Sequence, residues 1–166
     1  MTDDEYGKVR GTLVPVSCYL EPLGRLFVWF CLLEEALDRA LVMFLCSDPT
    51  TGAIVTKQFT SFVGKTELLM TLAKQRLGDV QLERLQTAIK KMKDANDLRN
   101  AIVHGTWGYA LGTKSEITLS KKSITKSGFP KEMPLDEAAI NDAADAAYRA
   151  QIVLDATLLG LGVVRV

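Results

Sequence analysis

The 166-residue chain has little that could bind a metal or form a disulfide. It contains one histidine, His104, and three cysteines, Cys18, Cys31 and Cys46, without a C-x-x-C pair. One imidazole cannot build a multi-histidine metal centre within one subunit. Three widely spaced cysteines favour reduced thiols packed in the interior over bridges or zinc ligands. We therefore expect no metal and no cofactor, and chemistry that needs an imidazole must use His104.

The sequence also predicts neither a membrane span nor an export signal. Charged residues interrupt the longest apolar stretch, 20–46, and a membrane helix would not carry them through hydrocarbon. The first residues are acidic, whereas a secretory signal begins with positive charge. We expect a cytoplasmic protein with no membrane partner.

The chain has no net charge, because 20 Lys and Arg balance 20 Asp and Glu. A positive field over the whole surface is therefore excluded, and nucleic acid would have to bind a local patch. The length and the 48% hydrophobic content suit one domain, residues 1–166, with a substantial core.

Apolar residues spaced three and four apart predict four long helices, over about 20–45, 60–77, 80–103 and 135–160. The turn formers of 47–52 end the first helix, since Pro49 cannot continue its hydrogen bonds. The residues expected on the buried face of the first helix are Leu23, Phe27, Phe30, Leu33, Leu37, Leu41 and Phe44.

Between the third and fourth long helices the period changes to alternation, which predicts a β-hairpin over about 106–128. The expected fold is mainly all-α, a four- or five-helix up-and-down bundle with this small β-hairpin after the third long helix.

The third helix breaks its own pattern near its end. Its apolar seam runs through Leu85, Ile89 and Met92, but the next two seam positions are Asn96 and Arg99. A buried charge is tolerated only when it is paired or faces a wet cleft. Such a break in a local rule is typical of a functional site.

His104 follows at the predicted end of this helix, where Gly105 supplies a stop. Arg99 lies five residues earlier, about 140° around an ideal helix. We therefore expect the two side chains to converge only if the helix end loosens.

The run Leu98-Arg99-Asn100-Ala101-Ile102-Val103-His104-Gly105 resembles the R-x4-6-H motif of HEPN domains, the higher eukaryotes and prokaryotes nucleotide-binding bundles. Those domains resemble four- or five-helix bundles with the motif at the end of a late core helix, and the likeness spans most of the chain. Trp29 and Glu34 are also similar to that family's first helix.

The resemblance implies a metal-independent endoribonuclease that works as a homodimer, with two copies of the motif in one cleft. His104 would act as base or acid, Arg99 would bind phosphoryl oxygens, and Asn100 would orient either the imidazole or the phosphate. The products would carry 2′,3′-cyclic phosphate and 5′-hydroxyl ends. Some members of this kind are toxins, so an antitoxin or another regulatory protein is an expected partner.

Further residues are expected around this motif. Glu34 and Asp97 are second-layer residues that could instead pair with Arg99 across a dimer seam. The residues expected to contact RNA are Asn96, Trp107, Tyr109, Lys114, Lys121 and Lys122.

The alternative is a catalytically inactive helical module for nucleotide binding or protein interaction, in which Arg99 and His104 are structural. His104 would then cap the carbonyls at the end of its own helix. Trp107 would pack in the core under this hypothesis.

Overall fold

The structure is a computed structural model that describes residues 19–45, 48–59, 61–104, 106–109, 117–124 and 130–162. These residues form five helices and a small sheet. The helices are α2 (Leu20–Leu45), α3 (Pro49–Thr56), α4 (Phe62–Arg76), α5 (Asp79–His104) and α6 (Glu137–Gly160), and the strands are β1 (Thr106–Tyr109), β2 (Ile117–Ile124) and β3 (Pro130–Leu135). The prediction of a mainly helical bundle is confirmed, and the four long helices lie close to their predicted positions.

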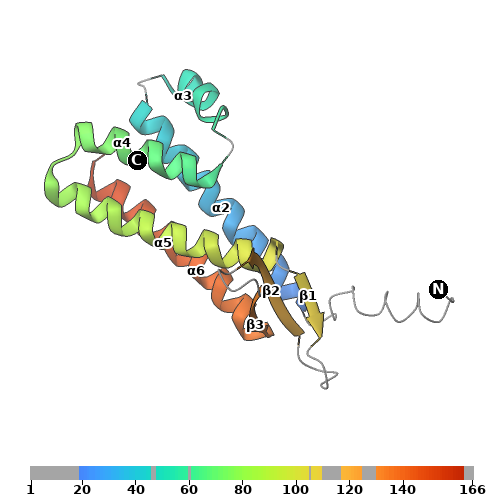
Figure 1. Ribbon diagram of the computed structural model, residues 1–166. Coiled ribbons are helices and arrows are strands. Elements are labelled where there is room, and N and C mark those ends of the chain that lie inside the picture. The colour runs from blue at the N-terminus through green and yellow to red at the C-terminus, as the bar shows by residue number, and fades with distance from the viewer. Residues whose placement is uncertain are drawn as a thin grey trace.

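The long helices α2, α5 and α6 form the body of the bundle (Figure 1), and α6 packs extensively against both α2 and α5. The α6 helix can approach α2 closely because small residues fill its inner face. Ala143, Ala144, Ala147 and Ala150 have no exposed surface. On α2 the opposing residues are larger, and Leu33, Leu37 and Leu41 are fully buried. Their burial is the main stabilising contribution to the bundle.

The ion pairs between α2 and α6 show the relative direction of these two helices. Arg25 lies 3.5 Å from Asp145, and Arg39, further along α2, lies 3.7 Å from Asp155, further along α6. The two helices therefore run parallel, whereas the first and last of four alternating helices would be antiparallel. The parallel direction agrees with the five-helix form of the expected bundle, because the short helix α3 lies between α2 and α4 in the chain.

The segment 47–52 was expected to be only a turn, but the helix α3 begins within it. Asp48 caps this helix, and its carboxylate accepts hydrogen bonds from the backbone amides of Thr50 and Thr51. The Thr51 hydroxyl also donates to this carboxylate, and together these bonds lower the pKa of Asp48 below 3.8. Pro49 is the first residue of α3, a position that suits proline because the amide there has no partner within the helix.

Two expectations about side-chain burial on α2 are wrong. Phe27 is 45% exposed, and the neighbouring Leu26 takes its place in the core. Cys31 is an exposed free thiol rather than a packed one, while Cys18 and Cys46 lie outside the described residues. The buried face of α2 is therefore rotated slightly about the helix axis from the face that the apolar spacing predicted.

A three-stranded antiparallel sheet of order β1-β2-β3 follows α5. In its register Trp107 pairs with Leu119, and Lys121 pairs with Lys131. Strand β2 lies against α5, so the sheet adjoins the helix that ends in His104 (Figure 1). Strand β3 follows the segment of about 106–128 in which the sequence predicted a hairpin.

No helix in the described part of the chain is both long enough and apolar enough to cross a membrane.

Candidate functional site

The site lies at the end of α5, where the apolar seam of this helix reaches the surface. Leu85, Ile89 and Met92 are buried in the main core, and Ala101 and Ile102 are buried in a second core cluster with residues of α2 and α6. The buried face of α5 thus shifts around the helix near its end. Arg99 continues the line of the first seam and is left half-buried, while His104 is exposed.

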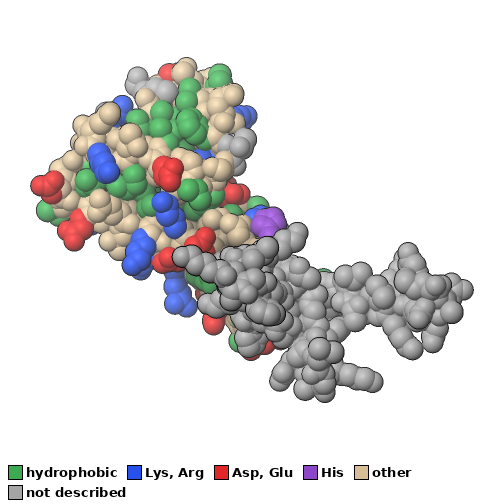
Figure 2. All heavy atoms as spheres, viewed as in Figure 1, with side chains coloured by type: hydrophobic (Ala, Val, Ile, Leu, Met, Phe, Trp, Pro, Cys, Tyr) green, Lys and Arg blue, Asp and Glu red, His purple; other side chains and the backbone are tan. Residues whose placement is uncertain are grey.

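Arg99 and His104 converge without any unwinding of the helix. The Nη1 atom of Arg99 lies 3.3 Å from Nε2 of His104, and α5 remains helical through His104. Side chains on a helix tilt toward its N-terminus, which directs the imidazole back toward Arg99, and the long arginine side chain covers the rest of the distance. The expectation that the helix end must loosen is therefore wrong. The exposed imidazole is visible at the molecular surface (Figure 2).

Asn100 completes the group, because its Oδ1 accepts a hydrogen bond of 3.0 Å from Nη1 of Arg99. The Nη1 nitrogen of Arg99 therefore contacts both the amide oxygen of Asn100 and the imidazole of His104. Asn100 orients the guanidinium in the free chain, which is a different task from the orientation of imidazole or phosphate expected from the sequence.

The guanidinium of Arg99 lies over the ring of Phe30, with its central carbon 5.1 Å from the ring centroid. Phe30 itself is 3% exposed and contacts the ring of Phe62 on α4, at 5.4 Å between centroids. Sequence analysis placed Phe30 in the core but gave no sign of its contact with Arg99. Periodicity shows which residues are buried on one helix, but not which residue of a distant helix they meet.

The positive charge of Arg99 has no acidic partner among the residues that the structure describes. Glu34 on α2 is half-buried and Asp97 on α5 is exposed, and neither forms an ion pair with Arg99. The Nε atom of Arg99 is buried and has no hydrogen-bond partner within the described ranges. An unmade hydrogen bond of this kind costs about 1–3 kcal/mol, so the arrangement is not optimised for stability.

The other predicted contact residues are Asn96, four residues of the sheet and Lys114. Asn96 is only 5% exposed, so it belongs to the core and the expectation that it contacts RNA is wrong for this surface. Trp107 and Tyr109 lie in β1, and Lys121 and Lys122 lie in β2, as the backbone of the sheet shows. Lys114 lies outside the described residues.

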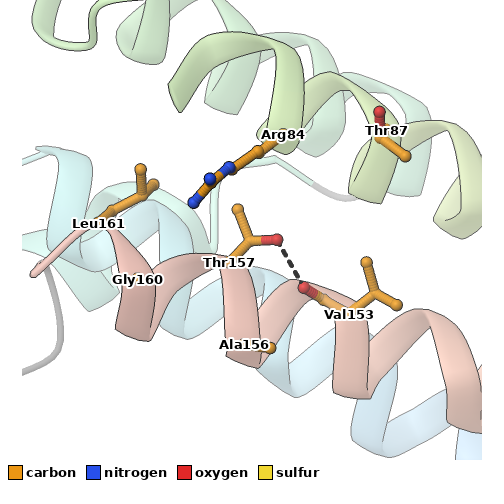
Figure 3. A pocket seen from close by; sticks show the side chains of 7 residues that line it. All are labelled: Arg84, Thr87, Val153, Ala156, Thr157, Gly160 and Leu161. Carbon is orange, nitrogen blue, oxygen red and sulfur yellow. Dashed lines mark hydrogen bonds between the residues drawn. The ribbon is translucent and has the colours of Figure 1, made fainter. Parts of the chain in front are cut away.

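Two surface pockets lie elsewhere on the bundle. One, of about 330 Å³ between α5 and α6, is crossed by the side chain of Arg84 (Figure 3). Its Thr157 hydroxyl donates to the carbonyl of Val153 at 2.7 Å and is therefore engaged within α6. The other, of about 490 Å³, lies between α2 and α3. Neither pocket includes Arg99 or His104.

Groups of three or more potential metal ligands are not found in the described ranges. The chemistry that Arg99, Asn100 and His104 offer is a fixed positive charge beside an exposed proton donor and acceptor. Comparison with models of known protein families, with curated proteins and with solved structures gave no match for this chain.

Proposed function

We propose that this chain is a metal-independent endoribonuclease of the HEPN type, in which Arg99 and His104 act on the phosphodiester of RNA. The observation that carries the proposal is the contact of 3.3 Å between the half-buried guanidinium of Arg99 and the exposed imidazole of His104. Among the described residues this guanidinium has no carboxylate partner. A guanidinium without an internal carboxylate has its charge available to an external anion, and its donor geometry matches phosphate.

The proposed reaction is transfer of the phosphodiester to the neighbouring 2′-hydroxyl. A base takes the proton from the 2′-oxygen, which bonds to phosphorus, while an acid protonates the departing 5′-oxygen. Arg99 stabilises the charge on the phosphoryl oxygens as the bond to the leaving oxygen breaks. The products are a 2′,3′-cyclic phosphate and a 5′-hydroxyl, and the reaction consumes no water.

Two imidazoles are needed if one histidine is the base and another is the acid. Because the chain has one histidine, the second must come from another copy of the chain. We therefore include a homodimer in the proposal. Apolar side chains are available for self-association on α2, where Phe27 is 45% and Val28 is 57% exposed.

RNA binding must also change the contact between Arg99 and His104. In the free chain Nη1 of Arg99 is directed at Nε2, the nitrogen that would accept a proton. A phosphate that bonds to the guanidinium competes for this donor and leaves Nε2 free. The free chain thus represents a resting arrangement of the proposed site.

The proposal is tested by the chemistry of the product ends. Purified protein is incubated with RNA in excess EDTA, and the fragments are analysed for terminal groups. The proposal requires 2′,3′-cyclic phosphate and 5′-hydroxyl ends that form with wild type and with the control variant Lys91→Ala, on the exposed side of α5. Fragments with 3′-hydroxyl and 5′-phosphate ends, or activity that EDTA abolishes, would contradict it.

A second candidate function is the inactive interaction module, and one observation favours it. The packing of Arg99 on the buried Phe30 ring is what a structural arginine would show. The two candidates differ in the expected effect of removing Arg99, because the loss of a structural arginine would lower the free energy of unfolding. A toxin role with an antitoxin partner is a further part of the proposal, and co-expression with neighbouring genes is its test.

A further inference from the structure

Side chains from three helices contact one another in succession beside His104. Phe62 of α4 contacts Phe30 of α2, and Phe30 lies beneath the guanidinium of Arg99 on α5. Phe62 is 8% exposed and Phe30 is 3% exposed, so the ring under the guanidinium is fixed by the core. A planar cation over such a ring is held by cation–π attraction and by contact with a rigid surface.

The hydrogen bonds of Arg99 determine the state of the imidazole. A guanidinium has donors only, so the contact of Nη1 with Nε2 requires that Nε2 accepts. The imidazole must then be neutral and carry its proton on Nδ1. The free chain therefore selects one of the two neutral tautomers of His104.

We propose that Phe30 is a positioning residue for this site: its ring sets the plane of the Arg99 guanidinium and thereby fixes His104 as the Nδ1–H tautomer. Arginines are commonly fixed by a bidentate carboxylate. Arg99 has no carboxylate partner in the described part of the chain, and its guanidinium contacts Phe30, Asn100 and His104 there. Removal of the ring would leave the guanidinium held by the contacts of its single Nη1 atom with Asn100 and His104.

The catalytic consequence of this inference rests on the proposed function. With the proton held on Nδ1, the nitrogen that becomes free when phosphate draws Arg99 away is Nε2. Phe30 thus makes Nε2 the proton acceptor through its effect on the position of Arg99, and its ring does not contact the substrate.

The test uses ¹⁵N NMR of the imidazole, which is free of assignment ambiguity because His104 is the only histidine. Spectra are recorded near pH 8, well above the ordinary histidine pKa of about 6.5. Wild type is expected to show one predominant Nδ1–H tautomer, and Phe30→Leu is expected to show exchange between both tautomers. Phe44→Leu is the matched control, since Phe44 is on the same helix, 2% exposed and without contact to Arg99. A wild-type Nε2–H tautomer, or an equal change in Phe44→Leu, would overturn the inference.

A measurement on wild type alone covers the case in which Phe30→Leu does not fold. The Phe30 ring is expected to shift the side-chain protons of Arg99 upfield in the ¹H spectrum, because the guanidinium lies over its face. Arg99 protons at the positions of an exposed arginine would overturn the inference.

RNA cleavage separates this inference from the proposed function. If both hold, Phe30→Leu lowers kcat about tenfold with a much smaller change in KM, as expected for a misplaced catalytic group. If wild type cleaves no RNA while its tautomer still depends on Phe30, the proposed function fails and the positioning role stands. If wild type cleaves RNA and Phe30→Leu leaves both kcat and the tautomer unchanged, the positioning role fails and the function stands.

Discussion

Nη1 of Arg99 donates at once to Oδ1 of Asn100, at 3.0 Å, and toward Nε2 of His104, at 3.3 Å. The guanidinium that carries these contacts has a neutral amide and a neutral imidazole as its polar neighbours. Its charge is therefore uncompensated within the described part of the chain. Substitutions of Arg99 and Asn100 test whether this cation is maintained for an external anion or for the fold.

Arg99→Ala should change the free energy of unfolding by less than about 1 kcal/mol. The lost cation–π contact is worth about 0.5–2 kcal/mol, and relief of the unpaired buried Nε is worth a similar amount in the opposite direction. Urea denaturation of wild type and variant measures the difference. A loss of about 3 kcal/mol or more would favour the structural role of Arg99 and the interaction-module alternative.

Asn100→Asp should weaken RNA binding about tenfold, although the substitution only replaces the side-chain NH2 group by an oxygen. The new carboxylate would form an internal ion pair with Arg99 and compete with phosphate for the guanidinium. Fluorescence anisotropy with a labelled RNA measures the affinity. The matched control is Asn141→Asp, because Asn141 accepts a hydrogen bond of 2.9 Å from Arg25 in the same way. Equal weakening by both variants would show that the effect is only one of net charge.

Ala147→Leu should destabilise the bundle by about 1–3 kcal/mol, because Ala147 has no exposed surface in the close α2–α6 contact. This corresponds to a decrease in Tm of several degrees for a chain of this size. Ala156→Leu, at an exposed position of the same helix, serves as the control and should leave Tm nearly unchanged. A tolerated Ala147→Leu would contradict the close packing of α6 on α2.

The sequence predicted most of the helical framework but less of the side-chain arrangement. Periodicity located α2, α4, α5 and α6, because core burial on a helix repeats every three to four residues. It missed α3, since Asp48 and Pro49 are suited both to a turn and to the start of a helix. The break at Asn96 and Arg99 was visible in the sequence, but only the fold separates the buried Asn96 from the half-buried Arg99. The contact with Phe30 depends on how α2 and α5 meet, which no local pattern records.

The Asp48 cap of α3 should make a pH-dependent contribution to stability. Hydrogen bonds from Thr51 and Thr50 lower the pKa of Asp48 in the folded chain below its ordinary value of 3.8. The contribution is therefore present above pH 3.8 and is lost as the pH falls through the lower, folded pKa. Thermal melts should show Asp48→Ala less stable than wild type at pH 7, with the difference shrinking toward pH 2. A difference that is independent of pH would contradict this role for the carboxylate.

The central claim is that His104 transfers protons at the phosphodiester of RNA. Its most direct test is the single-turnover rate of RNA cleavage by wild type and by His104→Ala in EDTA, with equal folding checked by circular dichroism. The account predicts a loss of about 10²–10⁴-fold in the variant, the usual contribution of a positioned general acid or base. Equal rates for the two proteins, or no cleavage by wild type, would contradict it.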